Sequence, residues 1–226
     1  MSVDAHSQRI WEFRSLTGPW LCRRRLLTRG ILLAKQAGVQ KVMIVSPLPD
    51  VGYLVSLGFH TATSSERVAV FADPSQFPDL VVDRSVRRPS PSDVLQIHKL
   101  IARQARAGHL LPRTIAEIEV LRRFFLVVRK GSRVAGCVAL EIYSSELAEV
   151  RSLVVDEEFQ DNGIGQKLLE ACLALARDNG ISEVMAVTSK IAFFERCGFA
   201  RTIRGSLGLF LNPATWDPKV YLPDRP

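Results

Sequence analysis

Two hydrophobic patterns alternate along this chain: apolar residues three or four positions apart, which predict helices, and short apolar runs, which predict strands. In the first 60 residues they predict a helix at 20–37, a strand at 41–46 and a short helix that ends at 57–59. Gly38 is placed to cap the first helix, and Pro47 interrupts the strand. The N-terminal part is therefore expected to be a helix–strand–helix unit.

A longer series of elements follows a polar, proline-bearing passage at 73–80. Ser92 is expected to cap a helix that begins near residue 94, and Thr114 with Glu117 forms a capping box that opens a second helix. The remaining pattern predicts a strand at 86–88, strands at 124–128, 134–142, 150–155 and 183–187, a long helix before Gly180, a short helix at 192–199 and a last hairpin at 200–211. We expect three parts: a unit at 1–80, a domain at 84–211 and an extended tail at 212–226.

The stretch 150–176 carries the strongest chemical signal. An apolar strand and an acidic turn lead into Gln160-Asp161-Asn162-Gly163-Ile164-Gly165, after which leucines recur at helical spacing. The unpaired N–H groups and the dipole at a helix start favour an anion, and the two glycines let a pyrophosphate approach the backbone. Two glycines in a turn are weak support alone. The turn also lacks the Gly-Lys-Ser/Thr ending of a Walker loop and the third glycine of the dinucleotide fingerprint.

Composition narrows the classes of function. At 226 residues with 47% hydrophobic residues, the chain has room for one domain and a smaller unit. It has no apolar run of membrane length and no signal-peptide pattern, so we expect a cytoplasmic protein without a membrane partner. The four cysteines form no Cys-x-x-Cys pair, which favours packed thiols, and no metal is expected. The net charge of +7 comes without a nucleic-acid motif, so a basic surface for an anionic cofactor or acidic substrate is preferred to a nucleic-acid partner.

The glycine turn and its flanks resemble a known family. Leu153-Val154-Val155, a short turn and the Gln160-x-x-Gly163-x-Gly165 opening of a helix are similar to the pattern of the GNAT acyl-CoA-dependent N-acetyltransferases. More narrowly, residues 84–205 resemble the short, kinase-less bacterial N-acetylglutamate synthases, a likeness carried by four segments: 110–113, 134–140, 147–156 and 193–199. The resemblance implies an α/β (α+β) GNAT fold with a mixed, mostly antiparallel sheet flanked by helices. It also implies acetyl transfer to the α-amine of glutamate, the first step of arginine biosynthesis.

The same resemblance implies how acetyl-CoA, the co-substrate, is bound. Its pantetheine arm would lie beside the strand Leu153-Val154-Val155 and bond to its main chain. A backbone N–H of Leu153 or Val154 would face the developing oxyanion, which makes these two residues catalytic candidates. The pyrophosphate would be held by the turn and the first helical turn, through Gln160, Asp161, Asn162, Gly163, Ile164, Gly165, Gln166 and Lys167.

A glutamate acceptor carries two carboxylates, which arginine can bind bidentately. Arg113 and Arg151 are the first candidates, and the expected substrate site also includes Leu111, Arg204 and Ser206. On position alone Arg151 is equally well explained as a solvated charge on a half-buried strand, but the matched segment favours substrate binding. Glu149 shares a strand face with Arg151. It is a candidate base, acting directly or through water, although simple pairing with Arg151 is the preferred interpretation.

Two positions bear on proton transfer. Many GNAT enzymes have a tyrosine as general acid where this chain has Phe194, which cannot donate a proton. The thiolate is therefore expected to leave unassisted or to take its proton from water, and the short synthases carry the same Phe-Phe pair. His109, in the loop before the second helix, is a candidate proton acceptor, although a lone loop histidine is more often structural or solvated.

The N-terminal helix–strand–helix order is repeated in the later domain. A shift of 142 positions lays 26–46 on 168–188 and pairs, among others, Leu26 with Leu168, Gly38 with Gly180 and Val42 with Val184. We interpret residues 1–80 as a degenerate partial copy of the later fold, although any amphipathic helix followed by a strand gives some identities. Leu21 and Arg23 stand where the later copy has its two glycines, so the first copy is not expected to bind the cofactor in the same way.

Three functions stay open at this stage. The leading one is a glutamate N-acetyltransferase with a small-molecule amino-acid substrate. The second is a GNAT enzyme for another small amine or a protein amine, and the third is a non-catalytic acyl-CoA-binding regulatory subunit. In each case the N-terminal copy is expected to serve packing, homo-oligomerisation or regulation.

Overall fold

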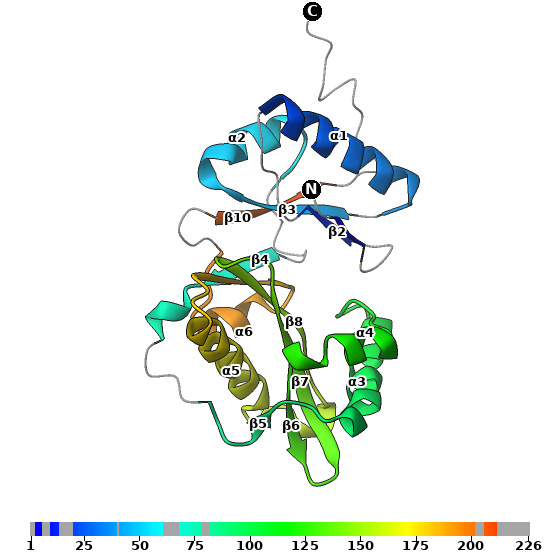
Figure 1. The fold of residues 1–226 in the computed structure, drawn as a ribbon, viewed down its shortest axis with the longest axis vertical. Helices are drawn as coiled ribbons and strands as arrows, with labels where there is room; N and C mark the ends of the chain where they lie inside the picture. The colour runs from blue at the N-terminus through cyan, green and yellow to red at the C-terminus, as the bar shows by residue number, and fades with distance from the viewer. Residues whose placement is uncertain are drawn as a thin grey trace, which may run out of the picture. The chain divides into compact units, whose positions relative to one another are not determined.

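The chain consists of two units with separate sheets (Figure 1). The computed structural model describes residues 3–5, 10–13, 20–39, 41–60, 68–77, 82–201 and 206–211. One unit comprises residues 1–69 and 201–226, and the other comprises residues 70–200. These boundaries differ from the expected division at 80–84, which falls inside the second unit. The expected tail at 212–226 lies outside the described residues.

The second unit is built on a six-stranded sheet in the order β4-β9-β8-β7-β6-β5. Neighbours from β5 to β8 pair antiparallel, whereas β8 and β9 pair in parallel. The strands are β4 (Val68–Ala72), β5 (Val86–Arg87), β6 (Phe125–Lys130), β7 (Arg133–Ile142), β8 (Leu147–Val155) and β9 (Glu183–Thr188). This confirms the expected mixed, mostly antiparallel sheet. β4 is an addition, because the sequence pattern did not predict it.

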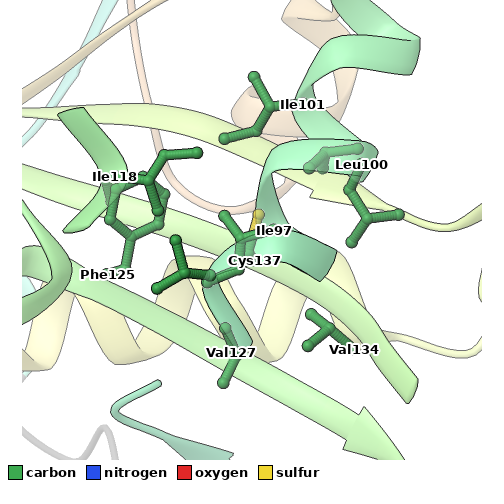
Figure 2. Packing of buried hydrophobic residues seen from close by; sticks show 11 residues of the cluster. Ile97, Leu100, Ile101, Ile118, Phe125, Val127, Val134 and Cys137 are labelled. Atoms are coloured by element: carbon green, nitrogen blue, oxygen red, sulfur yellow. The ribbon is translucent and has the colours of Figure 1, made fainter. Parts of the chain in front are cut away.

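Helices cover both faces of this sheet (Figure 1). α3 (Val94–Arg106) and α4 (Ile115–Val120) lie on one face, and α5 (Ile164–Asp178) and α6 (Ile191–Arg196) lie on the other. Under α3, apolar residues at helical spacing meet the inward side chains of β6 and β7. Figure 2 shows this core, whose labelled members are Ile97, Leu100, Ile101, Ile118, Phe125, Val127, Val134 and Cys137.

On the opposite face α5 packs close to the sheet at Gly136. A Cβ placed there would lie 3.0 Å from Ile164 Cγ2 and 3.1 Å from Leu168 Cδ1. The absence of a side chain at this position of β7 therefore sets the close approach of α5, the helix that follows the glycine turn.

Short 3₁₀ helices complete the unit: η1 (Pro74–Gln76), η2 (Pro91–Asp93), η3 (Arg122–Phe124) and η4 (Glu157–Phe159). The capping box of Thr114 and Glu117 at α4 is confirmed. The expected cap at Ser92 is wrong, because Ser90 and Asp93 form a capping box around η2 and α3 begins at Val94. A 3₁₀ turn here moves the cap two residues towards the N-terminus.

The first unit has a four-stranded sheet in the order β1-β2-β3-β10. Its elements are β1 (Val3–Ala5), β2 (Ile10–Phe13), α1 (Trp20–Gln36), β3 (Lys41–Pro47), α2 (Leu48–Ser56) and β10 (Ser206–Leu211). β10 pairs antiparallel with β3 along its whole length. The expected hairpin at 200–211 is therefore wrong: Ala200 bridges to Phe71 of β4, and the strand after it belongs to the other sheet. None of the described helices is long and apolar enough to cross a membrane.

The segments α1-β3-α2 and α5-β9-α6 share more than their order. β3 is parallel to β2 as β9 is parallel to β8. Gly38 and Gly180 have φ angles of 68° and 70°. The residues that follow them donate equivalent cap bonds, Val39 N to Ala34 O at 2.9 Å and Ile181 N to Ala176 O at 3.0 Å. These are the matches that a degenerate copy would have.

Each of these two segments is followed by a strand that pairs in the sheet of the other segment. β4 comes after α2 in the chain and is the neighbour of β9, whereas β10 comes after α6 and is the neighbour of β3. The two sheets therefore exchange their last strands, and the four-stranded sheet contains residues from both ends of the chain.

Candidate functional site

β8 contains a β-bulge at Ser152 and Leu153. These two residues lie opposite a single residue of β7, because the register pairs Cys137 with Val154 and Ala139 with Arg151. Ser152 has a φ angle of 53°, which residues other than glycine rarely adopt. Bulges of this kind bend a strand and redirect the groups that follow.

The bulge lies where β8 loses its pairing with β9. That parallel pairing ends at Glu149 and Met185, so later residues of β8 have no strand partner on this edge within the described part of the chain. Asp156 N donates to Ala135 O at 2.8 Å, which fixes the alternation of main-chain groups along β8. By this alternation Val154 directs its N–H and C=O groups towards β7, whereas Leu153 directs its own towards the open edge. Of the two sequence candidates, Leu153 is thus the one that presents an N–H there.

The turn after β8 is held by its own side chains. Gln160 Nε2 donates to Val155 O at 3.3 Å, and Asn162 Nδ2 donates to Gln160 O at 2.9 Å. Asp161 and Gly163 both have positive φ angles, of 61° and 70°. The turn is therefore a defined structure that reverses the chain directly into α5.

α5 begins at Ile164 without a side-chain cap. Lys167 N donates to Gly163 O at 3.0 Å, which leaves the three preceding helical N–H groups without an intrahelical partner. A Cβ at Gly163 would meet nothing within 4 Å, so the space beside this glycine is open. These features fit a pyrophosphate, which the helix start would hold through Ile164, Gly165 and Gln166.

Two side chains of the first turn of α5 contact protein neighbours. Gln166 Nε2 donates to Glu170 Oε1 at 2.8 Å, and Lys167 Nζ lies 2.9 Å from Asp83 Oδ2. Hydrogen bonds from Ser85 and Lys167 hold the pKa of Asp83 well below its usual range. Lys167 is therefore placed beside the turn by an exposed ion pair.

On the face that α3 and α4 cover, the apolar core ends in a cluster of charged residues. The pairing of Ala139 with Arg151 and of Glu141 with Glu149 places these four residues on one face of β7 and β8. Ala139 belongs to the core under α3, and the charged residues begin next to it. Arg113, Glu149 and Arg151 are all buried.

Glu141 joins the two arginines of this cluster. Its Oε2 accepts from Arg113 Nη2 at 3.4 Å and from Arg151 Nη1 at 3.3 Å. Arg151 Nε lies 3.7 Å from Glu149 Oε2, which also accepts a hydrogen bond from the Tyr143 hydroxyl. The pairing of Glu149 with Arg151, the preferred interpretation of the sequence, is thus present in the structure.

Arg113 connects the charged cluster to the bulge. It directly precedes Thr114, the N-cap of α4, and its Nε donates to Ser152 Oγ at 3.1 Å. The side chain is only 5% exposed, yet its Nη1 has no hydrogen-bond partner among the residues that the structure describes. An unpaired donor on a buried guanidinium is costly, and an anion bound there would satisfy it.

The structure brings together only part of the expected substrate site. Arg113, Arg151 and Glu149 meet, and Leu111 is half-buried two residues before Arg113. Arg204 lies outside the described residues, and Ser206 is the first residue of β10 in the other unit.

Three residues of the site were missed in the sequence: Glu141, Tyr143 and Ser152. Glu141 was within reach of sequence reasoning, since an antiparallel hairpin of the two predicted strands pairs it with Glu149.

The remaining residues that the sequence singled out are in contact with other side chains or buried in the core. The His109 ring bonds to Gln104 Oε1 at 3.0 Å and is exposed. Phe194 is buried edge-to-face against Phe193 and Phe199. Burial raises the pKa of the Cys172 thiol to about 12, as expected of a packed cysteine. Among the described residues, no group of three His, Cys, Asp or Glu side chains is arranged to hold a metal ion.

Comparison with known proteins agrees with this geometry. Residues 94–199 match the Acetyltransferase (GNAT) family. An uncharacterized N-acetyltransferase of Chlorobaculum tepidum is 38% identical over 118 residues, which cover 52% of this chain and 76% of that protein. An amino-acid acetyltransferase of Pseudomonas putida is 30% identical over 210 residues, which cover 88% of this chain but only 45% of that protein.

A solved structure extends the likeness to three dimensions. A crystal structure from Mycobacterium tuberculosis, in complex with CoA and NLQ, has a TM-score of 0.50 and 26% identity, and the match covers 56% of this chain and 98% of that one. The expected GNAT fold is thereby confirmed, and the open edge of β8 and the turn before α5 are the features that fit the cofactor. This chain belongs to the GNAT family of N-acetyltransferases, enzymes whose co-substrate is acetyl-CoA.

Proposed function

We propose that this chain transfers the acetyl group of acetyl-CoA to the α-amine of glutamate, and so catalyses the first step of arginine biosynthesis. The observation that carries the proposal is the buried Arg113 guanidinium, whose Nη1 finds no hydrogen-bond partner within the described part of the chain. The name of the Pseudomonas putida relative, amino-acid acetyltransferase, supports an amino acid as the acceptor. Every amino acid carries the carboxylate that such a guanidinium binds.

The position of Arg113 suits an acceptor that must reach the open edge of β8. Its Nε holds Ser152 Oγ at 3.1 Å, and Ser152 directly precedes Leu153, whose N–H is directed to that edge. A carboxylate on Arg113 would therefore be held next to the residue that precedes the main-chain donor. Such a placement lowers the entropy cost of bringing amine and thioester together.

The roles of the residues then follow from their surroundings. Acetyl-CoA supplies an activated acetyl group, and the Leu153 N–H would stabilise the charge that develops on its carbonyl oxygen, a type of donor worth about 100- to 1,000-fold in rate. Glu149 is buried and bonded to Arg151 and Tyr143, which supports a positioning role rather than that of a general base. Phe194 lies in the core and donates no proton, so water would accept the protons that the substrate ammonium loses and would supply the one that the leaving thiolate takes up.

The test is acetyl-CoA-dependent thiol release by the purified protein with each of the twenty amino acids. We expect turnover confined to glutamate, with glutamine as the closest competitor. Turnover of unrelated amines, or no turnover while acetyl-CoA still raises the melting temperature, would refute glutamate acetylation. The second result would favour a different amine or a non-catalytic acyl-CoA-binding role.

A matched pair of variants locates the carboxylate site. Arg113→Ala is expected to lower kcat/KM for glutamate about 10- to 100-fold, the value of one charge-assisted hydrogen bond. Arg106→Ala removes the same charge from an exposed position at the end of α3 and should leave kcat/KM unchanged. Acetyl-CoA binding, measured as the rise in melting temperature that it causes, should be the same in both variants.

A further inference from the structure

Glu141 differs from the other charged members of the cluster in its exposure. Its side chain is 18% exposed, against 5% for Arg113, 7% for Arg151 and 4% for Glu149. Glu141 stands near the end of β7, directly opposite Glu149 on β8. A negative charge is thus the part of this cluster that solvent, or an incoming molecule, reaches most readily.

The carboxylate of Glu141 also lies beside the unpaired donor of Arg113. Glu141 Oε2 and Arg113 Nη2 are 3.4 Å apart, and Nη1 of the same guanidinium is a buried atom for which the described residues provide no hydrogen-bond partner. A carboxylate can accept about four hydrogen bonds, so the bonds from the two arginines to Glu141 do not by themselves prevent it from binding the cation of a ligand. The site therefore offers one positive and one negative group side by side.

We infer that Glu141 makes the acceptor site selective for zwitterions, by holding the α-ammonium group while Arg113 holds the α-carboxylate of the same molecule. The inference rests on the proposed function and adds to it the residue that recognises the amine. In an α-amino acid the two charged groups are attached to one carbon, and adjacent groups of opposite charge match that arrangement. A simple carboxylate lacks the ammonium and would meet the negative charge of Glu141 instead.

A purely structural role would also explain why Glu141 bridges the arginines, and the two roles predict different results. The formal charges of Arg113, Arg151, Glu141 and Glu149 cancel. Glu141→Gln leaves the cluster with a net positive charge, which attracts any anion more strongly. A selectivity residue therefore has opposite effects on a zwitterion and on a plain dicarboxylate, whereas a tether affects both in the same direction.

The experiment compares glutamate as substrate with glutarate, the same dicarboxylate without the amine, as competitive inhibitor. In Glu141→Gln we expect the KM for glutamate to rise about 10- to 100-fold while the inhibition constant of glutarate stays the same or falls. Glu141→Asp keeps the charge and should restore most of the preference for glutamate. Glu146→Gln removes a charge from an exposed residue of the β7–β8 loop and should change neither constant.

Each other outcome overturns the inference. Equal weakening of glutamate and glutarate in Glu141→Gln would identify a tether, and unchanged constants would remove Glu141 from recognition. Wild-type turnover is measured first, because its absence counts against the proposed function and not against this inference. In that case melting-temperature titrations with glutamate and glutarate compare the same two ligands without turnover, and a wild-type preference for glutarate would overturn the inference.

Discussion

The bulge residue Ser152 combines a backbone constraint with a contact in the site, and two substitutions separate them. Ser152→Ala and Ser152→Gly both remove the Oγ atom that accepts from Arg113 Nε at 3.1 Å. Only the glycine variant also relieves the φ angle of 53°. The common effect of the two variants reports the contact, and the difference between them reports the backbone.

The magnitudes follow from these two contributions. A left-handed conformation costs a residue with a Cβ about 1–2 kcal/mol, which glycine avoids. Glycine loses about 0.5–1 kcal/mol more conformational entropy than alanine on folding. Ser152→Gly should therefore be more stable than Ser152→Ala by about 1 kcal/mol, or roughly 2–4 °C in melting temperature for a chain of this size. Both variants should raise the KM for glutamate by about 10-fold, because Arg113 loses a partner that orients it.

The assay is urea unfolding of both variants together with steady-state kinetics on glutamate. A free energy of unfolding for Ser152→Ala that is equal to or above that of Ser152→Gly would show that the bulge stores no backbone strain. An unchanged KM in both variants would show that the Ser152 contact does not position Arg113. Either result would refute the corresponding half of the reasoning.

Three further predictions concern the scaffold. Gly198→Ala should lower the free energy of unfolding by about 2–4 kcal/mol, because a Cβ there would lie 2.5 Å from the Phe77 ring and the residue has a φ angle of 85°. Gly180→Ala, whose Cβ would meet nothing within 4 Å, should lower it by only about 1 kcal/mol. Thermal unfolding of both variants measures the difference. Burial alone would raise the pKa of Asp93, but hydrogen bonds from Ser90 and Arg87 outweigh this effect, so the pKa lies below its usual value. Its contribution to stability is therefore complete above the unfolded-state pKa of about 4 and is lost as the pH falls below that value. Urea unfolding between pH 7 and pH 3 should show a shallower decline for Asp93→Asn, and an equal decline would contradict the assignment. A fragment of residues 82–226 lacks β4 and the partner of β10, so it should unfold at lower urea than the full chain, and equal midpoints would argue against the exchange of strands.

Much of this site was predictable because its parts are local in the sequence. The turn from Gln160 to Gly165 and the helix after it follow from periodicity and glycine spacing. Arg113 and Arg151 were found through segments that resemble a family. Glu141 was missed because its role depends on which residue lies opposite it in β8, and the predicted strand bounds, 134–142 and 150–155, did not define the loop that sets this register. The bulge was missed for the same reason, since it appears only when residues are counted across two strands.

The fold was predictable in its elements and not in its pairings. The segment 200–211 was expected to be a hairpin, but only residues 206–211 of it are a strand, and their partner is β3 rather than a neighbour in sequence. Hydrophobic alternation shows that a strand has a buried face and says nothing of which strand lies beside it. The expected division at 80–84 differs from the boundaries of the two units for the same reason, because a division based on composition cannot account for strands that join a distant sheet.

The exchange of β4 and β10 has a consequence for the synthesis of the protein on the ribosome. β3 ends at Pro47, but its neighbour on one side begins at Ser206, so this edge stays unpaired until nearly the whole chain has emerged. At roughly 5–20 residues per second the delay is on the order of ten to thirty seconds. During that time the nascent chain presents an exposed strand edge that other chains can pair with.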